Sequence, residues 1–504
     1  MMSFMDIAVD HEIVVVGAGF AGIGAAIKLR EAGFSDFVVL DEADGVGGTW
    51  HWNTYPGVAV DIPSFSYQFS FEKRSDWSRI YAPGRELKEY AEHCVDKYGV
   101  RGHFRLNTRV SGMSFDEDAG AWQIDTADGQ RITARFVISA TGVFSQPKLP
   151  DIPGAETFAG TTLHTARWDH SVQLSGKRVG VIGTGASAVQ VIPTVAPQVR
   201  ELTVFQRTPI WCLPKLDAPL GARARAVLRW VPGAMLAARW LSQAFVELTF
   251  VLVAHFAGTF PFLPARGEAE AHKLLGGVED PGLRQKLTPS YRLGCKRPSF
   301  SNEYIRTFNR ENVHLETSAI EEITPEGVRT ADGALHPVDV LVFATGYKVF
   351  EKGNIPPFPV NGIGGVELGD FWEANRLQAY EGVSVPGFPN WFTITGPYGF
   401  NGQSYFGLIE TQMRHIVRCL DRARAEQATR VEITPEANRR YFESVLARRG
   451  NQVFFRGTCA NSNSYYFDQH GDVPFRPSLT LEAAWRSARF DLDDYEFAGG
   501  ISIQ

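Results

Sequence analysis

Two glycine-rich loops in the chain have the residue types and spacing that bind the pyrophosphate of a dinucleotide. The first is Gly17-x-Gly19-x-x-Gly22 and the second is Gly183-x-Gly185-x-x-Ala188. The first glycine of this pattern permits a tight turn, and the second lets the backbone approach a phosphate. The third position lets the following helix pack closely on the sheet. Two such loops predict a protein that holds two nucleotides at once and moves electrons between them.

The residue that follows the second strand of each half predicts which nucleotide binds there. Asp41 lies 24 positions after Gly17, where a carboxylate accepts the ribose hydroxyls of an unphosphorylated adenosine. Arg207 lies at the same offset from Gly183 and is followed by Thr208. A guanidinium binds a phosphate bidentately and a carboxylate repels it, so the second half should prefer NADPH over NADH.

The elements around both loops predict parallel strands that present the loops at one edge of a sheet. Short apolar runs rich in β-branched residues are typical of strands buried on both faces. Such runs occupy 13–16, 37–40, 178–182 and 203–205, and each half closes with a similar strand and turn at 136–142 and 340–346. The second half is the longer one, and an apolar helical stretch accounts for the extra residues.

Length and composition predict a soluble enzyme of two or three domains that acts on a small molecule. The chain has 504 residues, 44% of them hydrophobic and 21% charged, and a formal net charge of -6. This charge does not suit a nucleic-acid binder. The five cysteines form no C-x-x-C pair, which argues against a disulfide framework, a zinc site or a dithiol redox centre, and we expect no metal site. Such cysteine usage favours a reducing compartment. The first ten residues lack the features of a signal peptide, so we expect a cytoplasmic protein.

One apolar segment tests this expectation. Residues 248–265 carry no formal charge, a length that is borderline for a membrane span. His255, Gly258 and Pro261 interrupt the segment, and several arginines precede it on what resembles an amphipathic helix. We therefore predict a buried helical insertion over about 213–286, with weak association to a membrane surface as the alternative.

A central segment and two flanking patterns connect the chain to a known family. Residues 158–169 match the pattern F-x-G-x-x-x-H-x-x-x-W-P/D at every fixed position, from Phe158 to Asp169. Gly47-Gly48-Thr49-Trp50 with Asp61, and Gly294-Cys295-Lys296-Arg297-Pro298, fit two more patterns. Through these motifs the chain, from about residue 11 to about 480, resembles the type I Baeyer-Villiger monooxygenases. Flavin monooxygenases that oxygenate nitrogen or sulfur share part of the motifs.

The resemblance implies an α/β fold with two Rossmann-like dinucleotide-binding domains. Residues 1–151 would form the first part of an FAD domain, and 152–350 an NADP domain with the helical insertion. Residues 351–504 would complete the FAD domain and wall the substrate pocket. The implied activity uses FAD, NADP(H) and O2 to convert a ketone to an ester or lactone through a C4a-peroxyflavin. Oxygenation of sulfides or amines, and an NADPH oxidase or flavoprotein reductase, are the alternatives.

The resemblance also implies roles for individual residues. Arg297 would be the fixed cation that stabilises negative charge on the flavin, with Asp61 as its partner, and both are the predicted catalytic residues. Lys296 would bind the 2'-phosphate together with Arg207 and Thr208. The predicted cofactor-binding residues are Gly17, Gly19, Phe20, Gly22, Asp41, Gly48, Thr49, Trp50, Asp61, Tyr67, Val110, Ala140, Thr141, Gly142, Gly183, Thr184, Gly185, Ala186, Ser187, Gln190, Arg207, Thr208, Lys296 and Arg297.

Three further expectations concern the surroundings of the flavin. His164 and Trp168 share one face if their segment is helical, and we expect them to couple NADP placement to domain rotation, with a purely structural role for His164 as the alternative. A helix over about 404–420 should point its N-terminus at the flavin, with Tyr398 and Phe400 near the pocket. Residues 463–466 replace a Ser-Trp-Tyr-type loop of better-known members, which leaves the choice of substrate open.

Overall fold

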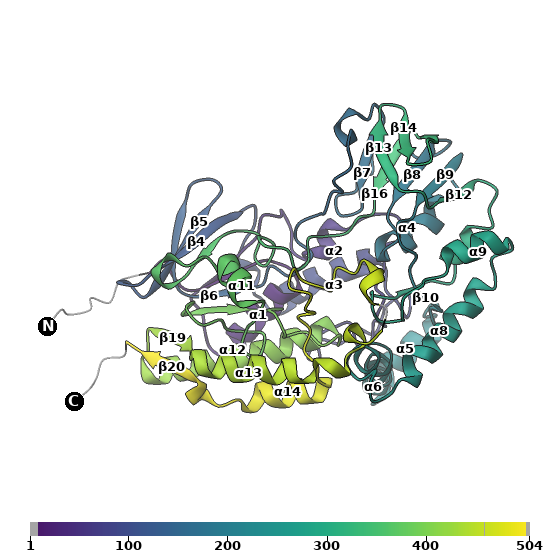
Figure 1. The fold of residues 1–504 in the computed structure, drawn as a ribbon. Helices are drawn as coiled ribbons and strands as arrows, with labels where there is room; N and C mark the ends of the chain where they lie inside the picture. Colours follow the sequence, from purple (N-terminus) through teal and green to yellow (C-terminus); the bar gives the residue numbers. More distant parts are fainter. Residues whose placement is uncertain (1–8, 458, 500–504) are drawn as a thin grey trace, which may run out of the picture.

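The computed structural model describes residues 9–457 and 459–499, which build two mixed layers of helix and sheet (Figure 1). The first sheet has eight strands in the order β17-β4-β5-β6-β1-β2-β3, with β18 paired to β6. These strands are β1 (His11–Val16), β2 (Phe37–Leu40), β3 (Phe104–Arg105), β4 (Val110–Asp116), β5 (Ala121–Thr126), β6 (Arg131–Ser139), β17 (Val360–Asn361) and β18 (Trp391–Thr393).

Strand β1 explains why a continuous apolar run is needed at the centre of this sheet. It runs parallel to both β2 and β6, with Ile13 opposite Phe37 and Phe136. Ile13 and Val15 pack into the core under the helices, whereas Val14 and Val16 pack into a second core on the opposite face. Both faces of the strand are therefore buried, as the sequence predicted.

The second sheet has five parallel strands in the order β12-β9-β8-β16-β7. They are β7 (Thr161–His164), β8 (Arg178–Ile182), β9 (Glu201–Phe205), β12 (Val313–Glu316) and β16 (Val340–Phe343). Three smaller sheets join β10 (Cys212–Leu213) to β11 (Ser299–Phe300), β13 (Ile320–Thr324) to β14 (Gly327–Thr330) and β15 (Leu335–Pro337), and β19 (Arg430–Ile433) to β20 (Tyr495–Ala498).

The two glycine-rich loops are built in the same way. Gly17 has φ +113°, and a Cβ there would lie 2.5 Å from the Ala140 carbonyl oxygen. Gly183 has φ +114°, and its Cβ would lie 2.5 Å from the Ala344 carbonyl oxygen. Only glycine tolerates both the positive φ and the close approach. Helices α1 (Phe20–Glu31) and α4 (Ala186–Val195) follow the two loops directly.

The C-terminal part of the chain returns to the first sheet. It contributes strands β17 and β18, and its long helix α12 (Tyr405–Glu426) packs against α1, where a Cβ on Gly24 would lie 2.6 Å from Ile409. Figure 1 shows α12, α13 and α14 along the lower side of this sheet, and Ser487 of α14 donates to the Thr411 carbonyl oxygen of α12. The remaining helices outside the insertion are α2 (Thr49–Trp52), α3 (Gly84–Lys97), α10 (Tyr304–Thr307), α11 (Leu368–Asn375), α13 (Pro435–Arg448) and α14 (Thr480–Arg489).

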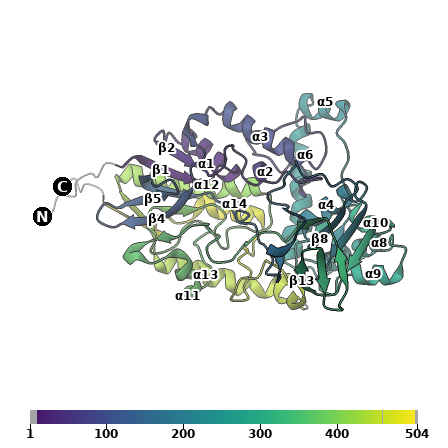
Figure 2. The same ribbon diagram turned by 90° about the horizontal axis from the view of Figure 1, so that it is seen from above.

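The helical insertion lies at the periphery of the second sheet, and α5 projects from the body in Figure 2. It comprises α5 (Ala222–Trp230), α6 (Ala234–Val246), a π-helical stretch (Glu247–Val251), α7 (Leu252–His255), α8 (Phe262–Leu275) and α9 (Pro281–Leu287). Val246, Val251 and His255 are buried, but Trp230 and Leu241 are each 73% exposed. The prediction of a buried insertion is therefore wrong for α5 and for one face of α6. The α/β fold class, with two nucleotide-binding sheets and a helical insertion, is confirmed.

Candidate active site

A single cavity of about 1840 Å³ connects the two glycine-rich loops. It is larger than the roughly 300–1,000 Å³ of a typical small-molecule site, as a pair of dinucleotides requires. Every predicted cofactor-binding residue except Gly22 lines it. Gly22 instead lies against the loop itself, because a Cβ there would be 1.8 Å from the Gly17 carbonyl oxygen. Its role is the close packing of α1, which the sequence pattern also predicts.

Both helix N-termini at this cavity suit an anion. Gly19 and Gly185 are the N-cap residues of α1 and α4, and neither helix has a side-chain cap or an acidic residue in its first turn. The first backbone N–H groups of each helix are therefore free to donate to a phosphate, and the helix dipole favours negative charge there. The residues present fit the pyrophosphate groups of two dinucleotides.

Asp41 lies at the end of β2, at the adenosine position that the sequence predicted. Its carboxylate accepts hydrogen bonds from the backbone N–H groups of Ala18 (2.5 Å) and Ala43 (2.8 Å). Burial raises the pKa of Asp41, although these two hydrogen bonds oppose the rise. The hydrogen bonds fix the carboxylate at the loop, which fits its expected ribose contact.

Two cations meet beside the second loop. Burial, followed by the charge of Arg207, lowers the pKa of Lys296 to about 8. Neither side chain makes an ion pair with an acid within the described part of the chain. Thr184 in the loop donates from Oγ1 to the Thr208 carbonyl oxygen (2.8 Å) and so fixes the backbone next to Arg207. Two neighbouring cations without an acidic partner fit a dianionic phosphate.

The predicted catalytic pair is formed at the other side of the cavity. Arg297 donates from Nε (3.1 Å) and Nη2 (2.5 Å) to Asp61 Oδ2. Desolvation by burial lowers the pKa of Arg297, but Asp61 and then the phenols of Tyr465 and Tyr466 outweigh it, and the net pKa is raised. The guanidinium is therefore a fixed positive charge that lines the cavity.

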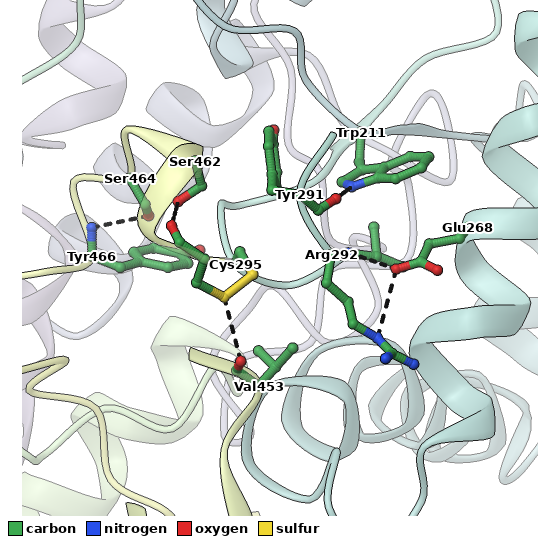
Figure 3. Close-up of a disulfide and its surroundings, with 11 residues drawn as sticks. Trp211, Glu268, Tyr291, Arg292, Cys295, Val453, Ser462, Ser464 and Tyr466 are labelled. Atoms are coloured by element: carbon green, nitrogen blue, oxygen red, sulfur yellow. Dashed lines mark hydrogen bonds and ion pairs between the residues drawn. A yellow bond between two sulfur atoms is a disulfide. The ribbon is translucent and has the colours of Figure 1, made fainter. Parts of the chain in front are cut away.

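A disulfide ties the segment of Arg297 to the loop 459–468, which the cysteine spacing did not predict. Cys295 and Cys459 are bonded, and Figure 3 shows Cys295 between the Tyr466 loop and the segment of Tyr291 and Arg292. The expectation that no disulfide forms is wrong because the partners are 164 residues apart in sequence and meet only in the fold. Because the structure contains this disulfide, the cysteines no longer support the inference of a reducing compartment.

The same loop reaches the nucleotide-phosphate side of the cavity. Asn463 donates from Nδ2 to Thr208 Oγ1 (2.7 Å), and Tyr465 and Tyr466 line the cavity near Arg297. One loop therefore touches both predicted cofactor sites, and its base is held by the disulfide. Sequence reasoning identified residues 463–466 only as a departure from other members of the family.

Gln190 on α4 joins the second half of the chain to the segment 55–59 of the first half. Its Oε1 accepts from the Tyr55 hydroxyl (2.9 Å) and the Ala59 N–H (3.3 Å), and its Nε2 donates to the Ala59 carbonyl oxygen (3.0 Å). Gln190 also lines the cavity, so contact with a nucleotide stays a prediction, but most of its hydrogen-bonding capacity is used between the sheets.

The central motif is a strand and turn, so the helical arrangement considered for it is wrong. His164 ends β7, its Nδ1 accepts from Ala166 N–H (3.0 Å), and its Nε2 contacts Thr345 Oγ1 (3.3 Å). Burial is the main cause that lowers the pKa of His164. Trp168 packs against the core of the second sheet. The motif thus fixes β7 against the turn after β16, and its coupling role stays a prediction.

A strained residue after β18 lines the cavity together with Tyr405, the first residue of α12. Thr395 lines the cavity with φ +77°, a left-handed conformation that is unfavourable for a β-branched residue. Its N–H donates to Gln412 Oε1 (2.8 Å), and its Oγ1 shares a hydrogen bond with the Tyr405 hydroxyl (3.1 Å). Phe400 lines the cavity as expected, but Tyr398 does not and packs on Phe442 instead. Among the described residues, no group of His, Cys, Asp and Glu side chains could hold a metal ion.

Comparison with known proteins finds relatives that match over most of the chain. Residues 14–216 match the model of the pyridine nucleotide-disulphide oxidoreductases. A Baeyer-Villiger monooxygenase of Streptomyces coelicolor is 37% identical over 96% of this chain and 92% of its own length. Another, from Pseudomonas aeruginosa, is 35% identical over 89% of this chain and 84% of its own. A phenazine N-monooxygenase of Lysobacter antibioticus is 34% identical over 84% and 85%.

Solved structures agree over almost the whole chain. Cyclohexanone monooxygenase from Rhodococcus sp. Phi1 bound to NADP+ has a TM-score of 0.86 at 31% identity, covering 97% of this chain and 99% of that one. The OTEMO complex with FAD and NADP has a TM-score of 0.85 at 29% identity, covering 97% and 100%. With two nucleotide loops on one cavity and this degree of identity, the chain belongs to the Baeyer-Villiger monooxygenases.

Proposed function

We propose that the cavity holds FAD against the first sheet and NADP(H) against the second, with Arg297 and Asp61 at their junction. In this arrangement 1–151 and 351–504 form the FAD domain and 152–350 the NADP domain. The enzyme is a flavoprotein monooxygenase that consumes NADPH and inserts one oxygen atom of O2 beside a ketone carbonyl, giving an ester or lactone. The uncapped helix N-termini and the Arg207–Lys296 pair support the two cofactor positions.

The observation that carries the proposal is the Arg297–Asp61 pair on the shared cavity wall. When bound, FAD and NADPH supply the electrons that activate O2. A guanidinium remains charged at every relevant pH, so Arg297 offers a positive charge that needs no reorganisation. Asp61 holds that charge in one orientation. A preorganised cation of this kind stabilises developing negative charge by about 3 kcal/mol, a factor of more than one hundred in rate.

The residues of the second half set the preference for the phosphorylated nucleotide. Arg207 supplies a planar fork and Lys296 a point charge, and both face the cavity without acidic partners in the described chain. Holding two like charges side by side without an acidic partner is unfavourable unless an anion joins them. A 2'-phosphate provides that anion, whereas the ribose hydroxyl of NADH does not.

Oxygenation of nitrogen or sulfur is the second candidate function. The observation in its favour is the phenazine N-monooxygenase among the relatives, at 34% identity. Turnover of a panel of cyclic ketones, sulfides and aromatic amines on one enzyme preparation separates the two. The proposed function predicts the highest kcat/KM for a ketone.

The test of the proposal combines product analysis with one substitution. Purified enzyme loaded with FAD should consume NADPH and O2 in equal amounts while it forms ester, and Arg297→Ala should lose ester formation by more than about a hundredfold while NADPH still reduces the flavin. Arg79→Ala is the matched control, because Arg79 pairs with Asp217 (2.9 Å) outside the cavity. An Arg297→Ala enzyme that still forms ester at the wild-type rate contradicts the proposal.

A further inference from the structure

Helix α6 exposes an apolar stripe along its length. Leu236, Trp240, Ala244 and Leu248 follow one another at intervals of four, and Leu241 lies beside them. Residues four apart share one face of a helix. Trp240 is 60% exposed and Leu248 is 53% exposed. The stripe therefore faces away from the protein over the whole helix.

Helix α5 continues this apolar surface. Val227, Trp230 and Val231 are all at least half exposed at the turn that leads into α6, and Phe262 at the start of α8 is exposed as well. Single exposed apolar residues are common on soluble proteins, but a contiguous group indicates a binding surface. The group includes Trp230 and Trp240, and tryptophan is enriched at interfaces because its side chain is largely apolar but carries a polar N–H.

The charges next to the apolar surface have one sign. Arg223, Arg225 and Arg229 are exposed on α5, and none forms an ion pair with an acid in the part of the chain that the structure describes. The acids of the same region are used elsewhere, since Asp217 binds Arg79 and Glu247 accepts from Thr480. A chain of net charge -6 therefore presents an uncompensated basic edge here.

The opposite side of α6 and α7 is fixed to the protein. The 22-residue helical stretch Ala234–His255 is long and apolar enough to cross a membrane by length and composition. Its most apolar 18-residue window has a mean hydropathy of 1.4, and 22% of that window is buried. However, Ser242 donates to Ser66 Oγ (2.8 Å), and His255 contacts the Asn401 carbonyl oxygen (2.8 Å) and Gln452 (2.9 Å). These buried polar contacts favour a helix that lies on a bilayer over one that crosses it.

Helix α14 adjoins the same region. Its first residue, Thr480, binds Glu247 at the end of α6, and the next turn exposes Leu481 and Trp485. Both α14 and α6 lie along the lower edge of the molecule in Figure 1. The exposed apolar side chains of the insertion and of α14 thus lie at one edge of the protein.

We propose that α5 and α6 form a docking surface for an acidic lipid bilayer, with the tryptophans and leucines in the interface and the α5 arginines on the headgroups. Tryptophan prefers the headgroup region, and an amphipathic helix rich in arginine on its polar side binds anionic lipid. The arginine edge makes acidic lipid the complementary partner.

The proposal is tested by flotation of the purified FAD-loaded enzyme with vesicles of phosphatidylcholine alone, or with phosphatidylcholine and phosphatidylglycerol in equal parts. Wild type should float with the acidic vesicles and much less with the neutral ones. Removing three arginines by Arg223→Gln, Arg225→Gln and Arg229→Gln should weaken binding about a hundredfold, because each contributes roughly a factor of five near an anionic surface. Trp240→Gln with Leu241→Gln should abolish it.

Matched controls change the same side-chain types on other surfaces. Arg200→Gln, Arg306→Gln and Arg310→Gln remove three exposed charges near the second sheet, and Leu335→Gln with Val366→Gln replaces two exposed apolar side chains. Both control variants should bind like wild type, and every variant should keep NADPH oxidation because these residues lie outside the cavity. Equal binding to both vesicle types, or no binding to either, overturns the proposal. A dimer in solution that Trp240→Gln with Leu241→Gln converts to a monomer overturns it in favour of a second copy of the chain.

Discussion

At the scale of single residues, the account depends on cations whose positions are fixed before any ligand binds. Asp61 fixes the position of Arg297, whose charge is permanent. Burial and the charge of Arg207 lower the pKa of Lys296, so the charge of Lys296 depends on pH. The two neighbouring residues therefore suit different tasks. A permanent charge stabilises negative charge during the reaction, and a titratable one binds a phosphate.

Lys296 gives a pH-dependent affinity for NADPH. Because the pKa of Lys296 is lowered to about 8, its amine is protonated and positively charged below that pH and loses this charge as the pH rises through about 8. The KM for NADPH should therefore rise as pH increases through about 8, whereas the KM for NADH, which lacks the 2'-phosphate, should not follow. Steady-state kinetics from neutral to alkaline pH measure this. Parallel profiles for both nucleotides contradict the assignment.

Substitution of both phosphate-binding cations tests their joint role. Arg207→Ala with Lys296→Ala should raise the KM for NADPH far more than that for NADH, by roughly tenfold or more for each lost contact of about 1.5–3 kcal/mol. Steady-state kinetics at neutral pH, with NADPH and with NADH in separate assays, give both values of KM. If both values of KM change by the same factor, the two residues do not recognise the phosphate.

These residues were accessible from sequence because each follows a strand or glycine loop at a fixed spacing. Asp41 and Arg207 share one offset, and the family motifs placed Arg297 and Asp61 together. The surroundings of Arg297 were not accessible, since Tyr465 and Tyr466 reach it from a segment more than 160 residues away. Likewise, the hydrogen bonds of Gln190 to Ala59 depend on how the two sheets meet.

At the scale of elements, the loop 459–468 connects the chemistry to the nucleotide site. The disulfide fixes its base next to Arg297, and Asn463 fixes its middle to Thr208. A loop held at two points presents Tyr465 and Tyr466 to the cavity in one arrangement. The physical reason why sequence could not reveal this is that a disulfide requires proximity in space, which cysteine spacing does not report.

Removal of the disulfide should loosen this loop. Cys295→Ser with Cys459→Ser should lower the free energy of unfolding by about 2–4 kcal/mol and speed hydrogen exchange over 459–468, because the covalent anchor is gone. Less ester should form for each NADPH consumed. Dithiothreitol should have the same effect on wild type and none on the double variant. Five titratable thiols, in place of three, in unreduced protein that has been unfolded in guanidinium would show that the bond does not form.

At the scale of the whole molecule, several hydrogen bonds beside the cavity join the segment 53–59 of the first half to the second half of the chain. Gln190 reaches Tyr55 and Ala59, His170 contacts Thr54 Oγ1 (2.9 Å), and Tyr347 donates to Asn53 Oδ1 (2.7 Å). Tyr55 and Val58 of this segment also pack on the core of the second sheet, so the junction combines hydrogen bonds with apolar packing. The sequence predicted the two sheets because each repeats strand, loop and helix, but their contact had no local signal.

Gln190→Ala tests the importance of this junction. The substitution leaves the Ala59 N–H and carbonyl groups without partners, at a cost of about 1–3 kcal/mol, so the melting temperature should fall and NADPH oxidation should become less coupled to ester formation. Thermal unfolding and the ratio of ester to NADPH consumed measure the two effects. Gln198→Ala is the control, since the Gln198 side chain is exposed and its hydrogen bond within the described chain goes to the Thr194 carbonyl oxygen of the same helical region. Identical behaviour of the two variants contradicts the role of Gln190 at the junction.

The most direct test of the central claim is oxygen isotope labelling of the product. FAD-loaded enzyme, NADPH and a cyclic ketone are incubated under ¹⁸O₂, and the product is analysed by mass spectrometry. The account predicts a lactone that carries one ¹⁸O atom for each NADPH oxidised, with labelled product lost in Arg297→Ala. NADPH oxidation that delivers all of the label to hydrogen peroxide or water, and none to an organic product, would contradict it.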